Sequence, residues 1–473
     1  MGLGKSIKGF AVILILTISF SSLALSRTGA AFAQPSSGDW PMFHANPSHT
    51  GVGSGNPVLT PTLLWNYTTG FQVESSPAVV NGVVYIGSDD GNVYALNAAN
   101  GDKIWNYTTG SPPEIQIPGG APPIPQNGVA TSPAVVDGIV YVGALDYNVY
   151  ALNAANGDKI WNYTTGYIVD SYPTVVNGVV YVGSLDDNIY ALNATKGDQL
   201  WNFTTEGPVY SSPAVVSGVV YVGSDDGNVY ALNATYGNKI WSYPTEAASM
   251  IGANWVVSSP AVVDGVVYVG SRDNNVYALN AVNGAKLWSY TTGGMVDSGP
   301  AVANGIVYVG SDDGNVYALN AAKGNKIWNY TTASSILSSN AVVSSPAVVD
   351  GVVYVGSDGG NVYALNATNG NKIWNYTTLI ATISRVFSSG IISYTGNQIV
   401  ASPAVDNGVV YAGSLDGNVY ALGASPVSPS PISSGALPVV IAVVVAVVIV
   451  AAVVFLMFQK RLKTKTTSPP LTL

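Results

Sequence analysis

The sequence predicts an all-β protein assembled from eight copies of one four-stranded unit, and three observations lead to this prediction. First, the stretch from Ser75 to Thr109 holds four short runs rich in Val, Tyr, Trp and Thr, separated by turn residues. Second, versions of this stretch recur along most of the chain. Third, one copy lacks a fourth strand, and a spare fourth strand lies near the N-terminus.

Within the unit, we expect strands at 77–80, 83–87, 93–97 and 103–108. Asn81-Gly82 predicts a two-residue type I′ hairpin turn, because both central positions of that turn need a positive φ. Asp89 to Asn92 and Asn100-Gly101 are turn sequences of the same kind. The unit is therefore predicted to be a four-stranded antiparallel meander.

The central tyrosine of the third strand marks each copy. It occurs at Tyr94, Tyr150, Tyr190, Tyr230, Tyr277, Tyr317, Tyr363 and Tyr420, so the spacings are 56, 40, 40, 47, 40, 46 and 57 residues. The base period is 40 residues and the excess is insertion. Four-stranded units of about 40–45 residues are typical of β-propeller blades, so the sequence predicts an eight-bladed β-propeller.

The two ends of the array predict closure of the ring. The eighth unit ends after its third strand, at Leu422, and residues 64–69 form a fourth strand with no unit before it. Pairing the two would close the last blade with an N-terminal strand and remove open sheet edges.

The segments outside the array predict a membrane-anchored protein. Residues 1–33 have the pattern of a signal peptide, with a retained N-terminal anchor as the alternative. The propeller is assigned to 34–422 and a Pro/Ser-rich stalk to 423–435. A transmembrane helix is predicted at 436–458, and a short basic tail at 459–473. The positive-inside rule then places the tail in the cytoplasm and the propeller outside the cell.

Charge and composition exclude several classes of function. Residues 34–458 contain 10 Lys and Arg against 26 Asp and Glu, a net charge of −16, which argues against a nucleic acid or an anionic membrane surface as partner. The chain contains no cysteine. Thiol catalysis, zinc-thiolate sites and iron–sulfur ligation are therefore excluded.

The third and fourth strands carry a family resemblance. Sequences such as ALNAANGDKIW at 95–105 and 151–161 resemble the tryptophan-docking repeat of quinoprotein-like (PQQ-repeat) propellers, over about residues 39–422. The resemblance implies that a small Ala and a Gly turn let the indole of the outer strand pack on its neighbour, as a structural contact. The residues expected to dock in this way are Trp65, Trp105, Trp161, Trp201, Trp241, Trp288, Trp328 and Trp374.

The resemblance also implies quinone-dependent catalysis as an alternative function. In the dehydrogenases of this superfamily, PQQ and a calcium ion lie near the axis and a vicinal disulfide is common, yet this chain has no cysteine and no recognisable set of ligands. His44 and His49, the only histidines, are expected outside the array and without a metal. No catalytic or metal-binding residue is assigned, and the protein is expected not to be an enzyme.

The insertions all fall between the Trp strand of one unit and the first strand of the next, at 110–130, 246–257, 333–343 and 379–400. Because strand direction alternates, these loops share one face with the Asp-rich second turns. Variable loops on a rigid scaffold commonly form binding surfaces. The candidate partner-binding residues are Met250, Ile251, Trp255, Arg385, Phe387 and Tyr394. The alternative is that the loops only cover one another over the channel.

The acidic turns and the Asn-x-Thr sequons could each have a function or follow simply from turn propensity and repeat duplication. Acidic turns can hold Ca²⁺, but no interval matches an EF-hand, and Asp and Asn are good turn residues. Nine Asn-x-Thr sequons are candidate glycosylation sites, although duplication of one Asn-Tyr-Thr strand also explains them. They are Asn66, Asn106, Asn162, Asn193, Asn202, Asn233, Asn329, Asn366 and Asn375.

The sequence therefore predicts a membrane-anchored extracellular PQQ-like propeller that binds or scaffolds protein or glycan partners. It resembles non-enzymatic scaffold members of the superfamily, such as the propeller lipoproteins of barrel-assembly machinery. A cell-surface PQQ-dependent dehydrogenase with Ca²⁺ is one alternative, favoured by unlike polar residues facing the axis and disfavoured by repeated Ser, Ala and Val there. A structural surface-layer or adhesion component is the other.

Overall fold

The computed structural model describes residues 39–110, 128–246, 254–333, 340–387 and 390–424. The predicted signal peptide, membrane helix and basic tail, and the stalk from residue 425 on, lie outside these ranges. Within them, no helix has the length and hydropathy needed to cross a bilayer.

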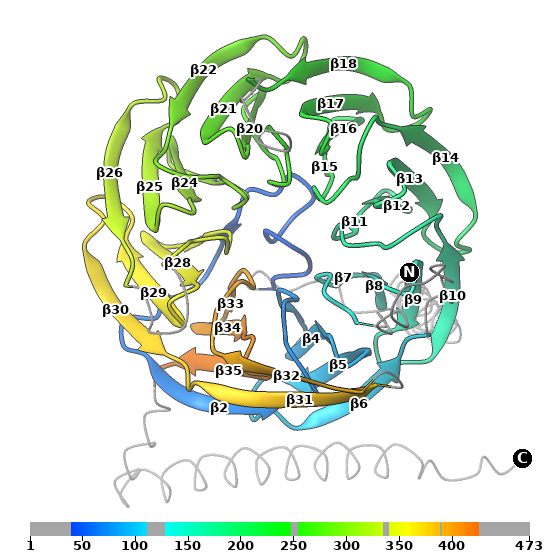
Figure 1. Cartoon of the computed structure of the whole chain (residues 1–473), viewed down its shortest axis with the longest axis vertical. Coiled ribbons are helices and arrows are strands. Elements are labelled where there is room, and N and C mark those ends of the chain that lie inside the picture. The colour runs from blue at the N-terminus through cyan, green and yellow to red at the C-terminus, as the bar shows by residue number, and fades with distance from the viewer. Residues whose placement is uncertain (1–38, 111–127, 247–253, 334–339, 388–389, 425–473) are drawn as a thin grey trace, which may run out of the picture. The chain divides into compact units, whose positions relative to one another are not determined.

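Eight blades surround an axis, as predicted (Figure 1). In each blade, successive strands pair antiparallel from the axis outward. The innermost strands are β3 (Ala78–Val80), β7 (Ala134–Val136), β11 (Thr174–Val176), β15 (Ala214–Val216), β19 (Ala261–Val263), β23 (Ala301–Ala303), β27 (Ala347–Val349) and β33 (Ala404–Asp406).

The second and third strands form the middle of each blade. The second strands are β4 (Val83–Ser88), β8 (Ile139–Gly143), β12 (Val179–Gly183), β16 (Val219–Gly223), β20 (Val266–Gly270), β24 (Ile306–Gly310), β28 (Val352–Ser357) and β34 (Val409–Gly413). The third strands are β5 (Asn92–Asn97), β9 (Asn148–Asn153), β13 (Asn188–Asn193), β17 (Asn228–Asn233), β21 (Asn275–Asn280), β25 (Asn315–Asn320), β29 (Asn361–Asn366) and β35 (Asn418–Gly423). Asn81 and Gly82, between β3 and β4, have φ of 52° and 75°, as a type I′ turn requires.

The fourth strands form the outer rim. They are β6 (Lys103–Thr108), β10 (Lys159–Thr164), β14 (Gln199–Thr204), β18 (Lys239–Pro244), β22 (Lys286–Thr291), β26 (Lys326–Thr331), β30 (Lys372–Thr377) and β2 (Thr62–Thr68). β2 pairs antiparallel with β35, with Tyr67 opposite Val419, so an N-terminal strand completes the eighth blade. The predicted closure of the ring is confirmed.

Two features differ from a uniform array of four-stranded blades. β1 (Val52–Gly53) adds a fifth, parallel strand to the axial edge of the seventh blade. The insertion at 379–400, expected as a loop, contains a hairpin of β31 (Ala381–Phe387) and β32 (Gly390–Gly396). Both arms of this hairpin contain β-branched and aromatic residues, which suit a two-stranded ribbon.

The hydrophobic core is divided among the interfaces between blades. One cluster joins Trp241 and Tyr221 of the fourth blade to Val267 and Leu279 of the fifth, all buried. The other blades repeat the arrangement with equivalent residues. The ring is therefore stabilised mainly by each blade packing on the next.

Candidate functional site: the axial cavity

The inner edges of the blades are covered by the N-terminal segment. Residues 40–53, here called the plug, run inside the ring (Figure 1). The central Val N–H of six innermost strands donates to a plug carbonyl at 2.7–2.9 Å, and the acceptors are Trp40, Pro41, Pro47, Ser48, Thr50 and Gly51. A buried strand edge needs such partners. The plug carbonyls therefore satisfy N–H groups at the inner edges of six blades, as a neighbouring strand would.

The third blade holds the plug through a side chain instead. His49 Nε2 lies 2.9 Å from Thr174 Oγ1, and His44 Nδ1–H donates to the His49 carbonyl at 3.1 Å. Both histidines are buried, 2% and 0% exposed, in the plug, which precedes the first blade in the sequence. Burial lowers the pKa of His44 to about 4 and, together with the charge of His44, that of His49 to about 3.

A serine ring surrounds the channel beside the plug. Its eight members, one from each blade in order, are Ser76, Ser132, Tyr172, Ser212, Ser259, Gly299, Ser345 and Ser402. Six backbone N–H groups of the ring donate to the hydroxyl of the next blade's serine at 2.8–3.0 Å. The bond from Ser402 N–H to Ser76 Oγ joins the eighth blade to the first.

The two departures from serine accommodate the plug. The Tyr172 ring contacts Phe43 edge-on with centroids 4.9 Å apart. A Cβ on Gly299 would lie 3.4 Å from His44 Cε1 and 3.1 Å from Ser345 Oγ, so glycine leaves space there. In the third and sixth blades, Tyr172 and Gly299 therefore stand in place of the ring serine where the plug packs.

A second ring, two residues earlier in each blade, differs from blade to blade. This variable ring consists of Glu74, Ala130, Asp170, Tyr210, Val257, Asp297, Val343 and Val400. Both patterns that would discriminate between binding module and dehydrogenase are thus present, a repeated serine ring and a ring of unlike residues. Four of its members end the inserted loops and the other four end the equivalent short connections, so the variable ring lies at the channel mouth on the loop face.

The two rings enclose a cavity of about 340 Å³. Its lining includes all eight residues of the variable ring, six of the serine ring, Phe43 of the plug, and Arg272. Glu74, Asp170 and Tyr210 are only half-buried, so the cavity is open to solvent. Phe43 contributes an aromatic surface from the plug.

The charges at this mouth are unevenly distributed. Burial, with a contribution from Glu74, raises the pKa of Asp170 to about 7. Burial also raises the pKa of Glu74 above its ordinary value. Glu74 and Asp170 come from the first and third blades, so they form an acidic pair on one side of the mouth.

On the opposite side, Arg272 is bound by Asp297. Its Nε and Nη2 donate to the two carboxylate oxygens of Asp297 at 2.8–3.1 Å. The guanidinium also lies over the Trp255 ring, 5.3 Å from its centroid. The hydrogen bond to Asp297 is the main reason why the pKa of Arg272 is raised.

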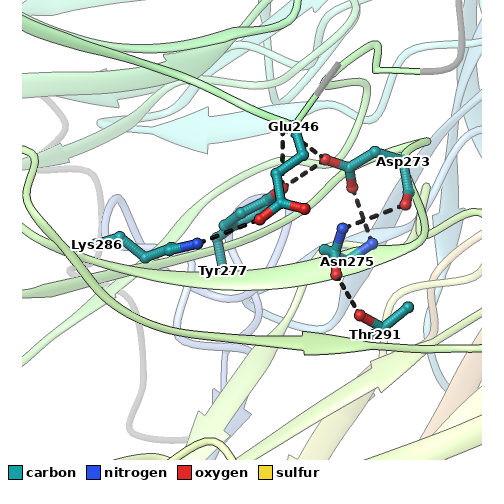
Figure 2. Close-up of polar contacts among 6 residues, drawn as sticks. All are labelled: Glu246, Asp273, Asn275, Tyr277, Lys286 and Thr291. Carbon is teal, nitrogen blue, oxygen red and sulfur yellow. Dashed lines mark hydrogen bonds and ion pairs between the residues drawn. The ribbon is translucent and has the colours of Figure 1, made fainter. Parts of the chain in front are cut away.

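In seven of the eight blades, the Asp two residues before the third strand is occupied by local hydrogen bonds. In the fifth blade, Asp273 accepts from Tyr277 Oη at 2.5 Å and from the N–H groups of Asn275 and Glu246 at 2.9 and 3.0 Å (Figure 2). Lys286 in turn pairs with Glu246 at 3.2 Å. Equivalent Tyr–Asp bonds occur in other blades. These carboxylates therefore fix the turns and the ends of the preceding loops.

The structure describes the side-chain contacts of only two of the six predicted partner-binding residues. Trp255 packs under Arg272, and Tyr394 of β32 donates to Gln398 Oε1. Burial is the main cause of the raised pKa of Tyr394, with contributions from Asp358 and Glu74. Met250 and Ile251 fall outside the described residues, and Arg385 and Phe387 are placed only as members of β31.

The eight rim tryptophans lie between blades. Trp241 Nε1–H donates to the Ala281 carbonyl of the next blade at 3.0 Å, and six others bond an equivalent alanine. Trp374 instead donates to the Val58 carbonyl at 2.7 Å, because the eighth blade takes its outer strand from the N-terminal segment. No rim tryptophan lines the axial cavity.

The sequons occupy two different environments. On the outer strands, the Asn side-chain N–H of the sequon donates to the first Asn of the third strand, as Asn106 does to Asn92 at 3.0 Å. In the turns, the side-chain oxygens of Asn193, Asn233 and Asn366 accept backbone N–H groups. Glycosylation of any of them stays a prediction.

PQQ with calcium fits these residues poorly. PQQ carries three carboxylates, whereas the cavity presents Glu74, Asp170 and Asp297, and Arg272 is already paired. Within the described residues, no three His, Asp or Glu side chains are grouped as metal ligands. Like charges would repel the cofactor at close range.

The chain has sequence relatives of two kinds. It is 34% identical over 110 residues to a quinohemoprotein alcohol dehydrogenase of Comamonas testosteroni, covering 22% of this chain and 14% of that enzyme. It is 33% identical over 97 residues to outer membrane protein assembly factor BamB of Yersinia pestis, covering 20% of this chain and 23% of that protein. The aligned parts thus span less than a quarter of either relative.

Solved structures of both kinds share the fold. BamB from Moraxella catarrhalis superposes with a TM-score of 0.58 at 19% identity, covering 77% of this chain and all of that one. A europium-containing methanol dehydrogenase gives 0.64 at 14% identity, covering 82% and 98%. The family model described as outer membrane protein assembly factor BamB matches residues 59–167, 165–257 and 252–449. With that match over most of its length, the protein belongs to the PQQ-repeat propeller family that BamB represents.

Proposed function

We propose that this protein is a membrane-anchored extracellular propeller that acts as a binding or scaffolding module for protein or glycan partners. The partner surface is the loop face, where the inserted loops and the variable ring meet. The name of the BamB relatives, outer membrane protein assembly factor, supports a partner-binding role.

One observation carries this proposal. Eight blades that are near copies elsewhere differ at the variable ring, where Glu, Asp, Tyr, Val and Ala replace one another. Packing does not require this variation, because the half-buried Glu74 and Val343 occupy the same place in their blades. The blade repeats therefore build the scaffold, and the loop face carries what distinguishes one blade from another.

The last strand ends on the face away from the loops. β35 begins at Asn418, beside the Asp416 turn on the loop face, and ends at Gly423 opposite Val409. The chain therefore leaves the eighth blade on the face opposite the proposed partner surface.

The dehydrogenase alternative predicts cofactor binding, and we expect none. Isothermal titration of the full-length chain with PQQ, with and without 1 equivalent of Ca²⁺ per protein, should give no saturable heat, because the cavity is acidic. A quinoprotein dehydrogenase that binds PQQ serves as the positive control. Saturable calcium-dependent binding would overturn the proposal in favour of a dehydrogenase.

The topology has its own test. Protease added to intact cells should degrade the propeller but leave an epitope tag after Leu473 protected. Permeabilised cells are the control, in which the tag should be lost as well. A protected propeller in intact cells would contradict the extracellular placement.

A further inference from the structure

The floor of the axial cavity carries buried hydroxyl groups that still have a hydrogen to donate. Four members of the serine ring line the cavity and are only 1–7% exposed, namely Ser212, Ser259, Ser345 and Ser402. Each Oγ accepts one backbone N–H from the preceding blade, at 2.8–3.0 Å. A hydroxyl also donates one hydrogen, and within the described part of the chain none of these four has an acceptor for it. Buried donors without an acceptor indicate a missing partner.

The mouth of the cavity presents mainly acceptors. The carboxylates of Glu74 and Asp170 line it, and neither accepts a hydrogen bond from another described residue. On the other side, Arg272 donates through Nε and Nη2 to Asp297, while its Nη1 has no acceptor within the described ranges. A ligand that fits must therefore accept at the floor and donate at the mouth.

The wall between floor and mouth contains two aromatic rings, those of Tyr210 and Phe43. Phe43 is fixed in place, because it stacks on His44 with centroids 4.2 Å apart and meets the Tyr172 ring edge-on. An aromatic face packs well against C–H groups, while it offers no strong hydrogen bond of its own. The wall therefore suits a ligand that has one apolar face among its polar groups.

We propose that the axial cavity binds one uncharged sugar residue at the end of a glycan chain. Each sugar hydroxyl is both a donor and an acceptor, so the same ligand accepts from the serines and donates to Glu74 and Asp170. The C–H groups on one face of its ring lie against Tyr210. This inference rests on the proposed function, since it identifies a glycan as the partner class of the loop face.

The size and charge of the cavity limit which sugars fit. The volume of about 340 Å³ is near the lower end for small-molecule pockets, about 300–1,000 Å³, which suits a single sugar ring. The open mouth lets the rest of the chain continue over the loop face. A uronic acid would meet Glu74 and Asp170 at close range, while the only guanidinium among the described lining residues is already paired with Asp297.

The test is an array of defined glycans probed with the detergent-solubilised full-length chain, detected through a tag after Leu473. The array presents chains that end in neutral sugars and matched chains that end in uronic acids. We expect binding to a set of neutral-ended chains and none to their acidic counterparts. The methyl glycoside of the bound terminal sugar should compete, because a single residue fills the cavity.

Matched variants separate the cavity from the rest of the loop face. Y210A should weaken binding about ten-fold, and it should fold because Ala130 occupies the same place in the second blade. Y167A is the control, since Tyr167 is exposed on the same face, contacts the Tyr147 ring and does not line the cavity. S345A/S402A, which removes two floor donors, should also weaken binding, and its thermal midpoint shows whether the ring stays intact.

Three results would overturn the inference: no glycan is bound, acidic ends are bound as well as neutral ones, or Y210A and Y167A lose binding equally. The proposed function would survive each of them with a protein as partner. Its own tests, the PQQ titration and the protease assay, do not depend on sugar binding.

Discussion

Replacing Trp241 by alanine is expected to lower the free energy of unfolding by about 3–5 kcal/mol. The side chain is 8% exposed, packs between the fourth and fifth blades, and donates to the Ala281 carbonyl. A Cβ on Gly284 of the next blade would lie 2.7 Å from the indole, so the two are in direct contact. Denaturant unfolding followed by circular dichroism measures the effect.

The neighbouring residue on the same strand is the control. Ile240 is 46% exposed, so Ile240→Ala should cost less than about 1 kcal/mol. Gly284→Ala, at φ +71°, should in contrast destabilise the protein, because the added methyl meets the Trp241 ring. Equal losses for Trp241→Ala and Ile240→Ala would show that the indole does not dock.

The second large effect is a pH dependence caused by the plug. Burial holds the pKa of His44 at about 4 and of His49 at about 3, below the usual 6.5. The unfolded chain therefore takes up protons below pH 6.5 that the folded chain refuses. Each histidine should cost about 2 kcal/mol of stability between pH 7 and 5, with further loss down to the folded pKa values.

Asparagine is a suitable replacement, because His44 and His49 both have positive φ, 53° and 54°, which asparagine tolerates. The stability of H44N/H49N relative to the original chain should rise by about 4 kcal/mol from pH 7 to 5. The comparison must be between the two proteins, because the raised pKa of Asp170 and Asp225 gives both chains an opposite slope. A difference that stays constant with pH would contradict the prediction.

The sequence predicted the blades because each local signal agreed with the global fold. Asn81-Gly82 can form few turns other than type I′, and the unpaired strand around Trp65 had one vacant place to fill, beside β35. Repetition made these signals stronger, since each weak pattern occurred in eight copies. The strands and their order followed from this consistency.

The plug could not be predicted, because backbone atoms make most of its contacts. The Val215 N–H bonds the Pro47 carbonyl, and neither residue type specifies that pairing. The sequence did contain one indication of the plug, because two blades have Tyr172 and Gly299 where the other six have serine. Tyr172 and Gly299 are explained only once Phe43 and His44 lie beside them.

The axial cavity was predictable only in part. Loop lengths drew attention to the insertions, whereas the polar members of the variable ring, Glu74, Asp170, Tyr210 and Asp297, lie in the four blades without an inserted loop before them. Glu74 and Asp170 are 96 positions apart in the sequence, and only ring closure brings them to one mouth. A comparison of the repeats at each position, rather than of their lengths, would have identified the variable ring.

The pairing of β2 with β35 also bears on how the protein is made. Asn66 and Asn418, which are hydrogen-bonded in the eighth blade, are separated by 352 residues. The ribosome therefore releases the plug and β2 first, and their last partners arrive only when nearly the whole chain has been synthesised. The blades must assemble around a segment that is already present, so the plug is enclosed by the growing ring and need not be threaded through a finished one. A chain interrupted before residue 418 would leave β2 and the first blade exposed, as targets for chaperones and proteases.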